Sequence, residues 1–486
     1  MSMGAGLPGD APLLKASAAK RPKAGIVHLG LGAFFRAHGA IYTAEAMARS
    51  GGDWGIIGVS LRHPTQRDLL QPQGFAYTAV ELAADGETAQ VVEVLQNVLV
   101  AREDPMAVLT AMADPAIRIV SLTVTEKGYC HAPSTGLLNR DHPDVIHDLA
   151  HDLPRSAPGF LVRALQMRRA AGLAPFSVLC CDNLPENGVM LRGIVLELAG
   201  LMDPGLADWI AHNGAFPSTM VDRIVPALKP EDIPGLAAKT GVTDRAPVLH
   251  EPFRQWVIED WFVAGERPDY AAVGADMVGD VRPFEHMKLR CLNGTHSALA
   301  YLGYLAGHQT IFDTMSDPAF AVYCRRLWQS EITPGLEAPE GVDLAEYTGQ
   351  LFQRYGNPAI RHLTHQIAMD GSQKLPQRIL ATISENLTAG RDSSGLILAV
   401  AAWMRYVGAT DENGQPIKVQ DPLAARLKTL SDKAGSVSEL VGSMLALREV
   451  FPADLVENPG FQTAVIASYT DLARHGARAC VLEFGS

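Results

Sequence analysis

Short apolar runs alternate with amphipathic helical patterns along the first half of the chain. Ile26–Gly32 is an apolar run that ends in glycines, which is typical of a buried parallel strand. Ala37–Arg49 follows it with the apolar spacing of a helix, and Trp54–Leu61 predicts a second strand. This order of strand, turn, helix and strand is the opening of a doubly wound α/β fold.

The same patterns continue and then change near residue 283. Further strands are predicted at Tyr77–Leu82, Gln90–Val94, Ile117–Thr125 and Phe176–Cys181. Helices are predicted between them at Pro105–Met112, Asp144–His151, Phe160–Ala171 and Val189–Leu201. Beyond Pro283 helical stretches dominate, at Met287–Leu305, Pro318–Gln329, Asp343–Arg354, Ser394–Tyr406, Val437–Val450 and Gly460–Arg474. We predict a flexible tail over residues 1–20, a doubly wound α/β domain over 21–283 and a mainly α domain over 284–486.

Composition narrows the class of protein. A chain of 486 residues exceeds the roughly 250–300 residues at which one hydrophobic core stops growing, which agrees with two domains. The net charge of −12 argues against nucleic acid or an anionic membrane as a partner. The six cysteines form no C-x-x-C pair, which indicates free thiols in a reducing compartment, the cytoplasm. The longest apolar stretch, Ala298–Ala306, is too short to span a bilayer.

Two glycines stand where the first strand should meet a helix. Small residues such as Gly30 and Gly32 let backbone N–H groups approach a pyrophosphate, although a plain tight turn explains them equally well. Phe35 replaces the third glycine of the G-x-G-x-x-G pattern of dinucleotide-binding domains. The acid that usually selects NAD ends the second strand, but here Asp53 precedes that strand and Arg62 follows it. This position therefore leaves NAD and NADP both open.

A lysine, an amide and a histidine follow one another as K-x4-N-x2-H at Lys288, Asn293 and His296. On an α-helix His296 projects roughly 80° from Lys288 and Asn293 about 140°, so all three fit one broad face. A neutral lysine can accept a hydroxyl proton while the amide and the histidine hold oxygens, which is what oxidation of an alcohol needs. That role needs the lysine pKa to fall from ~10.4 to ~7–8, on the order of 4 kcal/mol, which burial can supply. The plain alternative is a solvated polar helix start.

A second amide follows a strand that we predict to be buried. Asn183, in CDNLPENG, lies where loops of a doubly wound sheet line the ligand crevice, and it can donate to the same oxygen. An asparagine-rich turn is the alternative. Tyr-x3-Lys, H-E-x-x-H, G-x-S-x-G and Walker motifs are absent, and no metal site is predicted.

Six strings resemble the polyol-specific long-chain dehydrogenases, the family of mannitol 2-dehydrogenase, fructuronate reductase and D-arabinitol 4-dehydrogenase. They are IVHLGLGAFFRAH, SLTVTEKGY, CDNLPENG, FPSTMVDRIVP, MKLRCLNGTHSALAYLG and NPAIRHLTHQIAMDGSQKLP, which occur in the family's order in both halves. The resemblance implies a Rossmann-type domain that binds NAD, a helical substrate domain and a substrate cleft between them. It also implies an enzyme that needs no metal and is a monomer or a weak oligomer.

The resemblance also implies roles for individual residues. Lys288 is similar to the family's general base, Asn183 and Asn293 to the amides that hold the reacting oxygen, and His296 to a ligand of a substrate hydroxyl. We expect cofactor contacts from Gly30, Gly32, Phe34, Phe35, Arg36, Arg62, Thr123 and Thr125. We expect substrate or cleft contacts from Asp222, Glu285, Lys374 and Arg361, with Glu285 resembling an acid tied to proton release.

Two departures from the family pattern matter, the first for the contact with the cofactor and the second for the substrate. The glycine loop continues Phe34-Phe35-Arg36 where the family usually has Phe-His-Arg, and Gln366 stands where mannitol enzymes have an arginine. Gln366 and the string GVSLR look more like the fructuronate reductase branch.

We therefore expect NAD-linked reduction of a ketouronate such as D-fructuronate to D-mannonate, with NADP left open. Lys374 or Arg361 is the expected cation for the substrate carboxylate. One alternative is the same chemistry on an uncharged polyol, either mannitol to fructose or arabinitol to xylulose. The other is a nicotinamide-binding sensor without catalysis, against which the intact Lys288, Asn293 and His296 speak.

Overall fold

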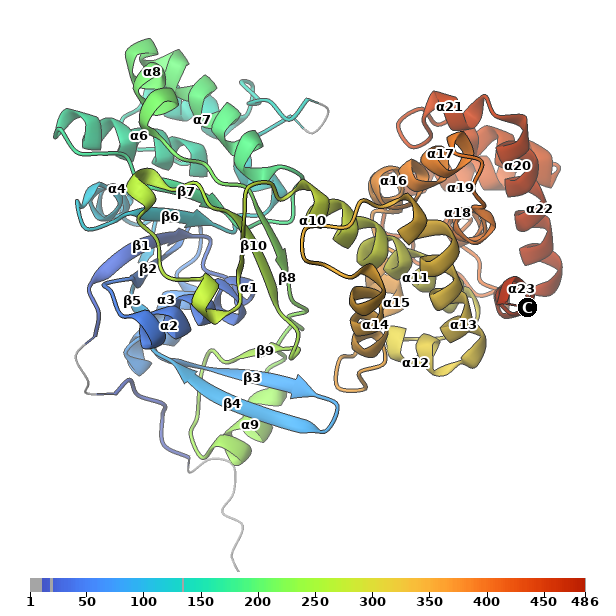
Figure 1. Cartoon of the computed structure of the whole chain (residues 1–486), viewed down its shortest axis with the longest axis horizontal. Helices are drawn as coiled ribbons and strands as arrows, with labels where there is room; N and C mark the ends of the chain where they lie inside the picture. The colour runs from blue at the N-terminus through green and yellow to red at the C-terminus, as the bar shows by residue number, and fades with distance from the viewer. Residues whose placement is uncertain (1–10, 18–20, 133–134, 486) are drawn as a thin grey trace, which may run out of the picture. The chain divides into compact units, whose positions relative to one another are not determined.

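The computed structural model describes residues 11–17, 21–132 and 135–485. The chain divides into two compact units, Met1–Arg282 and Pro283–Ser486, here named unit 1 and unit 2 and described separately (Figure 1). Unit 1 contains three sheets, and the described part of unit 2 contains no strand. The fold confirms the predicted class, an α/β Rossmann-type half followed by a mainly α half.

A five-stranded parallel sheet in the order β5-β2-β1-β6-β7 forms the centre of unit 1. Its strands are β1 (Ala24–Leu29), β2 (Gly55–Ser60), β5 (Leu95–Val100), β6 (Ile119–Leu122) and β7 (Ser177–Cys180). The chain starts in the middle with β1, moves outward through β2 and β5, and then returns to the other side of β1 with β6 and β7. The strand order therefore reverses between β1 and β6, and open α/β sheets bind ligands at the carboxyl end of such a reversal.

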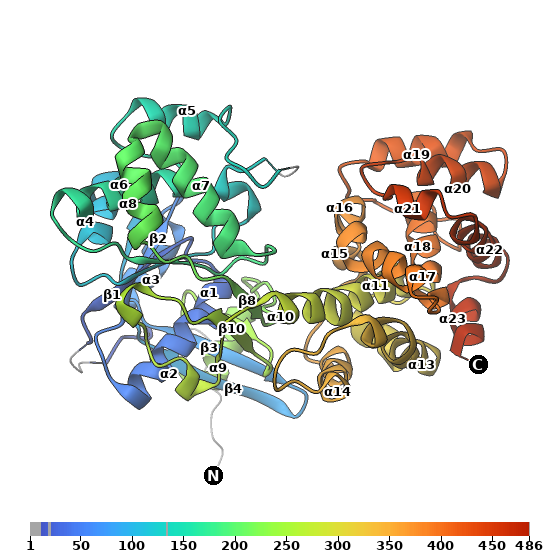
Figure 2. The same ribbon diagram turned by 45° about the horizontal axis from the view of Figure 1, so that its top comes forward.

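Both faces of this sheet are buried. In β1, Val27 and Leu29 belong to one apolar cluster and Ile26 to the other, because consecutive side chains of a strand point to opposite faces. Helices α6 and α7 lie on one side of the sheet and α2 on the other (Figures 1 and 2). The helices of unit 1 are α1 (Ala33–Ala37), α2 (Gly39–Ser50), α3 (Thr65–Leu70), α4 (Pro105–Ala113), α5 (Pro143–Ala150), α6 (Ala157–Ala170), α7 (Asn187–Met202), α8 (Pro204–Asn213) and α9 (Asp232–Thr240).

Two smaller sheets complete unit 1. One has the order β4-β3-β9, with β3 (Tyr77–Ala83), β4 (Gly86–Val92) and β9 (Val248–His250). The other has the order β11-β10-β8, with β8 (Thr219–Asp222), β10 (Gln255–Glu259) and β11 (Asp276–Val278). The hydrophobic pattern of the sequence predicts β3 and β4, whereas β5 and β8 to β11 were not predicted from it. Strands β8, β9 and β11 are too short, at four residues or fewer, to show a hydrophobic period.

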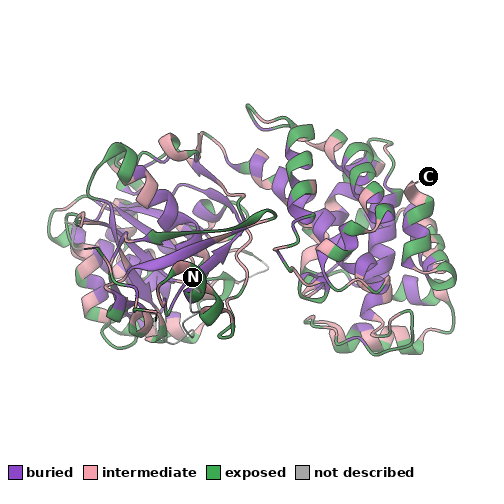
Figure 3. Cartoon of the chain, turned by 90° about the horizontal axis from the view of Figure 1, so that it is seen from below, coloured by how far each residue is buried: buried purple, intermediate pink, exposed green. Residues whose placement is uncertain are grey.

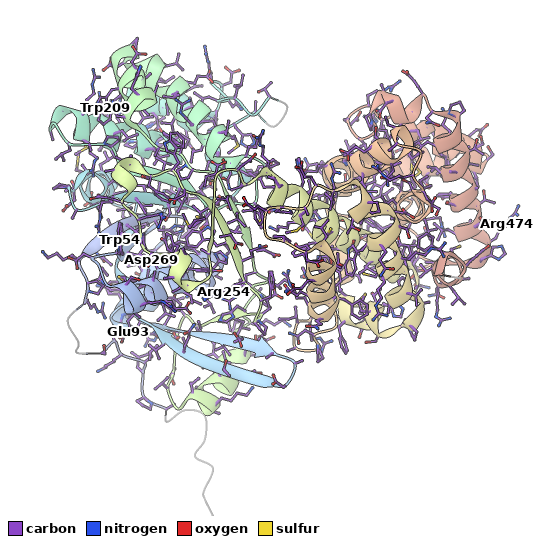
Figure 4. The ribbon with its side chains drawn as sticks, in the orientation of Figure 1. Trp54, Glu93, Trp209, Arg254, Asp269 and Arg474 are labelled. Carbon is purple, nitrogen blue, oxygen red and sulfur yellow. The ribbon has the colours of Figure 1, made fainter. Side chains whose placement is uncertain are left out.

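Residues 11–17, which belong to the tail predicted over residues 1–20, contact unit 1 through one side chain and several hydrogen bonds. The Leu14 side chain is 5% exposed, and its backbone N–H donates to the carbonyl of Thr243. The Ser17 hydroxyl donates to the carboxylate of Glu93, which Figure 4 labels, at 2.7 Å. One leucine and main-chain hydrogen bonds make this anchor, so a composition rich in glycine and alanine does not reveal it. Residues 1–10 and 18–20 lie outside the described residues.

Unit 2 is built around buried helices, which Figure 3 shows in the colour of buried residues with exposed faces outside. Every helix predicted for this half is present. Its α-helices are α10 (Arg282–Met287), α11 (Thr295–Leu305), α12 (Ile311–Ser316), α13 (Pro318–Arg326), α14 (Leu344–Tyr355), α15 (Thr364–Ile367), α16 (Gly371–Leu375), α17 (Ala381–Thr388), α18 (Ser394–Val407), α19 (Ala424–Lys433), α20 (Val437–Leu445), α21 (Ala453–Val456), α22 (Pro459–His475) and α23 (Ala477–Gly485). Three π-helical segments interrupt them, η5 (Lys288–Gly294), η6 (Leu327–Ile332) and η8 (Pro376–Leu380).

Candidate functional site

The glycine turn lies at the carboxyl end of β1, beside the reversal of strand order. Gly30 has a φ of +92°, and a Cβ there would stand 2.2 Å from the carbonyl oxygen of Thr123, so only glycine fits. A Cβ on Gly32 would meet no atom nearer than the Gly30 carbonyl oxygen at 3.8 Å. The space beside the Gly32 backbone is therefore open, which fits the close approach of a pyrophosphate that we expected here.

A buried histidine of β1 ties this turn to β6. The imidazole of His28 lies 2.9 Å from the hydroxyl oxygens of both Ser121 and Thr123, and the Thr123 hydroxyl donates to the Gly30 carbonyl. Burial lowers the pKa of His28 to about 3, so the ring is neutral at physiological pH. Because the single proton of the Thr123 hydroxyl goes to Gly30, Nε2 of His28 donates to Thr123 and Nδ1 accepts from Ser121. The Thr123 hydroxyl thus shapes the turn, a role that sequence reasoning missed.

The loops that follow β6 and β7 are joined by one carboxylate. Oδ2 of Asp182 accepts from the backbone N–H groups of Val124, at 2.8 Å, and Thr125, at 3.1 Å, and from the Tyr129 hydroxyl at 2.6 Å. Burial raises the pKa of Asp182, and these three donors oppose that rise. They hold Thr125 at a φ of +66°, which a threonine rarely adopts.

Asn183 is the exposed residue next to this anchor. Its loop is also fixed on the other side, where the buried side chain of Asn187 donates to the Asp182 carbonyl and to the Thr219 carbonyl, each at 2.9 Å. The structure therefore places Asn183 at the carboxyl end of the sheet, on the same edge as the glycine turn. This agrees with the position predicted for it.

The residues after the glycine turn point inward. Phe35 is buried, and its ring stacks on His28 with centroids 3.3 Å apart. The buried guanidinium of Arg36 donates to the Ala246 carbonyl and lies over the Tyr77 ring. The side chains of Phe35 and Arg36 are thus committed to the core, and their backbone is the part that a cofactor can reach. Phe34 is partly buried and stacks on His38.

The second strand separates the two residues considered for cofactor choice. Asp53 precedes β2 and its carboxylate accepts from the Lys23 backbone N–H at 3.0 Å. Arg62 follows β2 and is exposed, at the carboxyl edge of the sheet. Asp222, a predicted substrate residue, ends β8 in another sheet of unit 1 and is buried. The structure thus keeps the arrangement that left NAD and NADP open.

Three of the four predicted catalytic residues belong to unit 2 and lie on one continuous helical segment, namely Lys288, Asn293 and His296. Lys288 is 7% exposed and His296 is 8% exposed, while Asn293 is partly buried. Lys288–Gly294 is a π-helix rather than an α-helix, so the angles that we derived from α-helical spacing are wrong for this turn. π-turns occur mainly as short insertions in α-helices, frequently at functional sites.

Side chains from two other helical segments stabilise the π-turn. The indole N–H of Trp328 donates to the Cys291 carbonyl at 2.9 Å, and the Tyr355 hydroxyl donates to the Leu292 carbonyl at 2.8 Å. Gly294 also passes so close to η8 that a Cβ there would stand 2.6 Å from the Arg378 carbonyl oxygen. These partners are 35 or more residues away in the chain, so the local sequence gives no sign of the π-turn.

His296 lies in a cationic neighbourhood. Burial lowers its pKa well below the usual value, and the charges of His362, Arg378, Arg354 and Lys374 lower it further, in that order. The rings of His362 and Tyr355 lie 4.8 and 5.1 Å away, measured between centroids. A neutral imidazole with cationic groups around it favours a ligand that carries negative charge.

The other predicted residues of unit 2 differ in how far they are exposed and in what they contact. Lys374 is partly buried and donates to the Met369 carbonyl at 2.6 Å, and burial, followed by the charge of Arg378, lowers its pKa. Arg361 is exposed, and Glu285 is partly buried on α10, three residues before Lys288. Arg378 is a cation beside His296 that the sequence analysis did not select.

Three further findings concern the described residues as a whole. All six cysteines are free and buried, as their spacing predicted. Across residues 11–17, 21–132 and 135–485, no three His, Cys, Asp or Glu side chains gather as metal ligands would. No helix in that part of the chain is both long and apolar enough to cross a bilayer.

Comparison with known proteins finds matches along almost the whole chain. The family model of the mannitol dehydrogenase Rossmann domain matches residues 24–271, and that of the mannitol dehydrogenase C-terminal domain matches residues 280–473. D-Mannonate oxidoreductase of Escherichia coli is 47% identical over 461 residues, which are 94% of each chain. Mannitol 2-dehydrogenase of Pyricularia oryzae is 39% identical, covering 95% of this chain and 93% of its own. The structure of Pseudomonas fluorescens mannitol 2-dehydrogenase with NAD and D-mannitol is 37% identical, has a TM-score of 0.84, and covers 98% of this chain and 97% of its own.

Proposed function

Because the chain belongs to the mannitol dehydrogenase family, we propose that it is an NAD-dependent dehydrogenase of a sugar acid, reducing D-fructuronate to D-mannonate. The reaction consumes a ketone, NADH and a proton and yields a secondary alcohol and NAD⁺. Greater identity to the E. coli D-mannonate oxidoreductase, 47%, than to the P. oryzae mannitol enzyme, 39%, supports this choice of substrate.

Unit 1 supplies the cofactor side of the proposal. The open space beside Gly32 and the fixed turn at Gly30 suit the pyrophosphate of a dinucleotide at the reversal of the sheet. When bound, the nicotinamide gives or takes the hydride. The loop from Thr123 to Thr125, held by Asp182, forms the neighbouring wall of the same crevice. We assign Arg62, which is exposed just after β2, to the adenosine ribose of the cofactor.

Unit 2 supplies the proton. We assign Lys288 as the acid that protonates the new alkoxide during reduction, and as the base that removes the hydroxyl proton in the reverse direction, without a metal ion. Its burial supports this role, since a lysine in water stays fully protonated at neutral pH. Asn293 and Asn183 are assigned as donors to the reacting oxygen, and His296 as a ligand of a neighbouring hydroxyl.

The observation that carries the choice of a sugar acid is the charge around His296. Four groups of unit 2 that bear or can bear positive charge, His362, Arg378, Arg354 and Lys374, lower the pKa of this residue. A substrate carboxylate is attracted by these positive charges, whereas an uncharged hexitol is not.

Initial rates with NADH separate this proposal from its competitors. We expect a higher kcat/KM for D-fructuronate than for D-fructose, and a higher rate of oxidation for D-mannonate than for D-mannitol. Equal or better turnover of fructose and mannitol would indicate that the substrate is an uncharged polyol rather than a sugar acid. D-Mannitol is the polyol in the P. fluorescens complex. Tight NADH binding with no turnover of either class, including arabinitol and xylulose, would indicate a sensor instead of an enzyme.

A further inference from the structure

Arg378 is a partly buried arginine without a counter-ion among the described residues. Arg378 lies in η8. Its Nη1 donates to the Ser297 hydroxyl at 3.2 Å, and this is the one hydrogen bond of the Arg378 side chain among the described residues. Its Nε is closed off from solvent and has no partner in that part of the chain. Burial lowers the pKa of the guanidinium, and the groups that favour its charge are the hydroxyls of Tyr301 and Tyr355, not carboxylates.

Such an arrangement is costly for the protein alone. Partial burial of a charge without a partner of opposite charge is destabilising, and the enclosed Nε–H without an acceptor adds about 1–3 kcal/mol. The same unit shows the usual solution at Arg290, where two guanidinium nitrogens bind the two oxygens of Glu385 at 2.5 and 2.6 Å. Arg378 has no such carboxylate among the described residues.

A second unpartnered group lies in the same neighbourhood. Nδ1 of His362 is also enclosed without a hydrogen-bond partner among the described residues, and its ring lies 4.8 Å from that of His296. Both His362 and Arg378 act electrostatically on His296, and Ser297, which holds Arg378, is the next residue along α11. Polar atoms that the protein leaves without a hydrogen bond are therefore gathered beside the residue assigned to a substrate hydroxyl.

We propose that Arg378 binds the substrate carboxylate through the Nη nitrogens of its guanidinium, with the Ser297 hydroxyl holding Nη1 in place. This inference rests on the proposed function, because it names the residue that recognises the acid group. The planar guanidinium presents parallel N–H donors that match the two oxygens of a carboxylate, which a lysine ammonium does not. Lys374 already donates to the Met369 carbonyl and has Asp370 at 4.0 Å, and Arg361 is exposed. Arg378 thus replaces both as the carboxylate ligand.

The test compares charged and uncharged substrates in matched variants. NADH-dependent kcat/KM is measured for D-fructuronate, its uncharged amide and D-fructose with the wild type, Arg378→Gln, Arg378→Lys and Arg448→Gln. Arg448 is an exposed arginine of unit 2 and controls for the loss of one positive charge. Hydrogen bonds to charged groups contribute enough to predict a loss of about 10- to 100-fold for fructuronate in Arg378→Gln, mostly in KM. The amide and fructose should lose less than about threefold, and Arg448→Gln should match the wild type.

Each remaining outcome has a defined meaning. Equal losses for fructuronate, its amide and fructose would show a structural arginine and overturn the assignment, as would no loss at all. A loss specific to fructuronate in Arg361→Gln but not in Arg378→Gln would move the carboxylate to Arg361. If Arg378→Gln does not fold, Arg378→Lys keeps the charge without the fork and should still lose activity selectively on fructuronate. A wild type that prefers fructose would refute the proposed function itself, whatever the variants do.

Discussion

Removing one hydroxyl group tests whether the π-turn positions the catalytic lysine. In Tyr355→Phe the ring remains, so its stacking on His296 is kept, but the hydrogen bond to the Leu292 carbonyl is lost. That carbonyl still accepts from the backbone N–H of Thr295. The change therefore weakens the π-turn without opening a large cavity.

The expected magnitude follows from this geometry. Losing one buried hydrogen bond while the acceptor keeps another partner costs about 1 kcal/mol. If the π-turn relaxes by one residue to α-helical pairing, Lys288 rotates by about 100° relative to His296. If the aligned form becomes about 1 kcal/mol less stable relative to the misaligned form, its population falls by up to about fivefold. We therefore expect kcat/KM to fall by a similar factor.

A tyrosine elsewhere in unit 2 provides the matched control. Tyr323 is buried and its hydroxyl donates to the Gly395 carbonyl at 2.9 Å, away from the π-turn. Tyr323→Phe should lower the free energy of unfolding in urea by a similar amount and leave kcat/KM unchanged. If Tyr355→Phe affects the kinetics no more than Tyr323→Phe does, the π-turn does not position Lys288 and the reasoning is refuted.

Three further predictions concern cofactor binding and pH. Gly30→Ala should lower the free energy of unfolding by more than about 2 kcal/mol, because it combines a positive φ with a clash against Thr123. Gly32→Ala should instead weaken NADH binding in a fluorescence titration, with little loss of stability. If both variants lose the same stability, the assignment of Gly32 to the cofactor is contradicted. Burial raises the pKa of Glu331 from 4.5 to about 7, so its contribution to stability is full below pH 4.5 and is lost as the pH rises through 7. The full pKa shift corresponds to a loss of about 3 kcal/mol in the free energy of unfolding. In Glu331→Gln, the free energy of unfolding in urea should fall less steeply with rising pH. If its pH dependence is unchanged, another group causes the decline. Arg62→Ala should weaken NADPH binding more than NADH binding, and equal weakening would remove Arg62 from the ribose site.

The sequence predicts those strands and helices whose buried residues recur with a regular spacing. The apolar run at Ile26 predicts β1 because both faces of a parallel central strand are covered, and the helical spacing after Pro283 survives as α-helices. The glycine turn and Asn183 were predicted at the carboxyl edge of the sheet because strand order alone places them there. For Asp182 and Thr125, the type of residue gave no sign of a hydrogen bond across two loops.

What the sequence does not reveal depends on contacts between distant segments. His28 looks like one polar residue inside an apolar strand. Only its hydroxyl neighbours, Ser121 on β6 and Thr123 just after it, show that it organises the glycine turn. The π-turn needs donors from Trp328 and Tyr355, so a helical pattern at Lys288 is assigned α-helical spacing by default. Arg378 reads as an ordinary surface arginine until its surroundings show that no acid pairs with it.

The central claim is that Lys288 transfers the proton that accompanies hydride transfer to a sugar acid. Its most direct test is kcat/KM for NADH-dependent reduction of D-fructuronate by Lys288→Ala, with the NADH dissociation constant measured on the same preparation. General acid–base catalysis contributes about 10²- to 10⁴-fold, so we predict a loss of that size with NADH affinity unchanged. Wild-type turnover in Lys288→Ala would contradict the account.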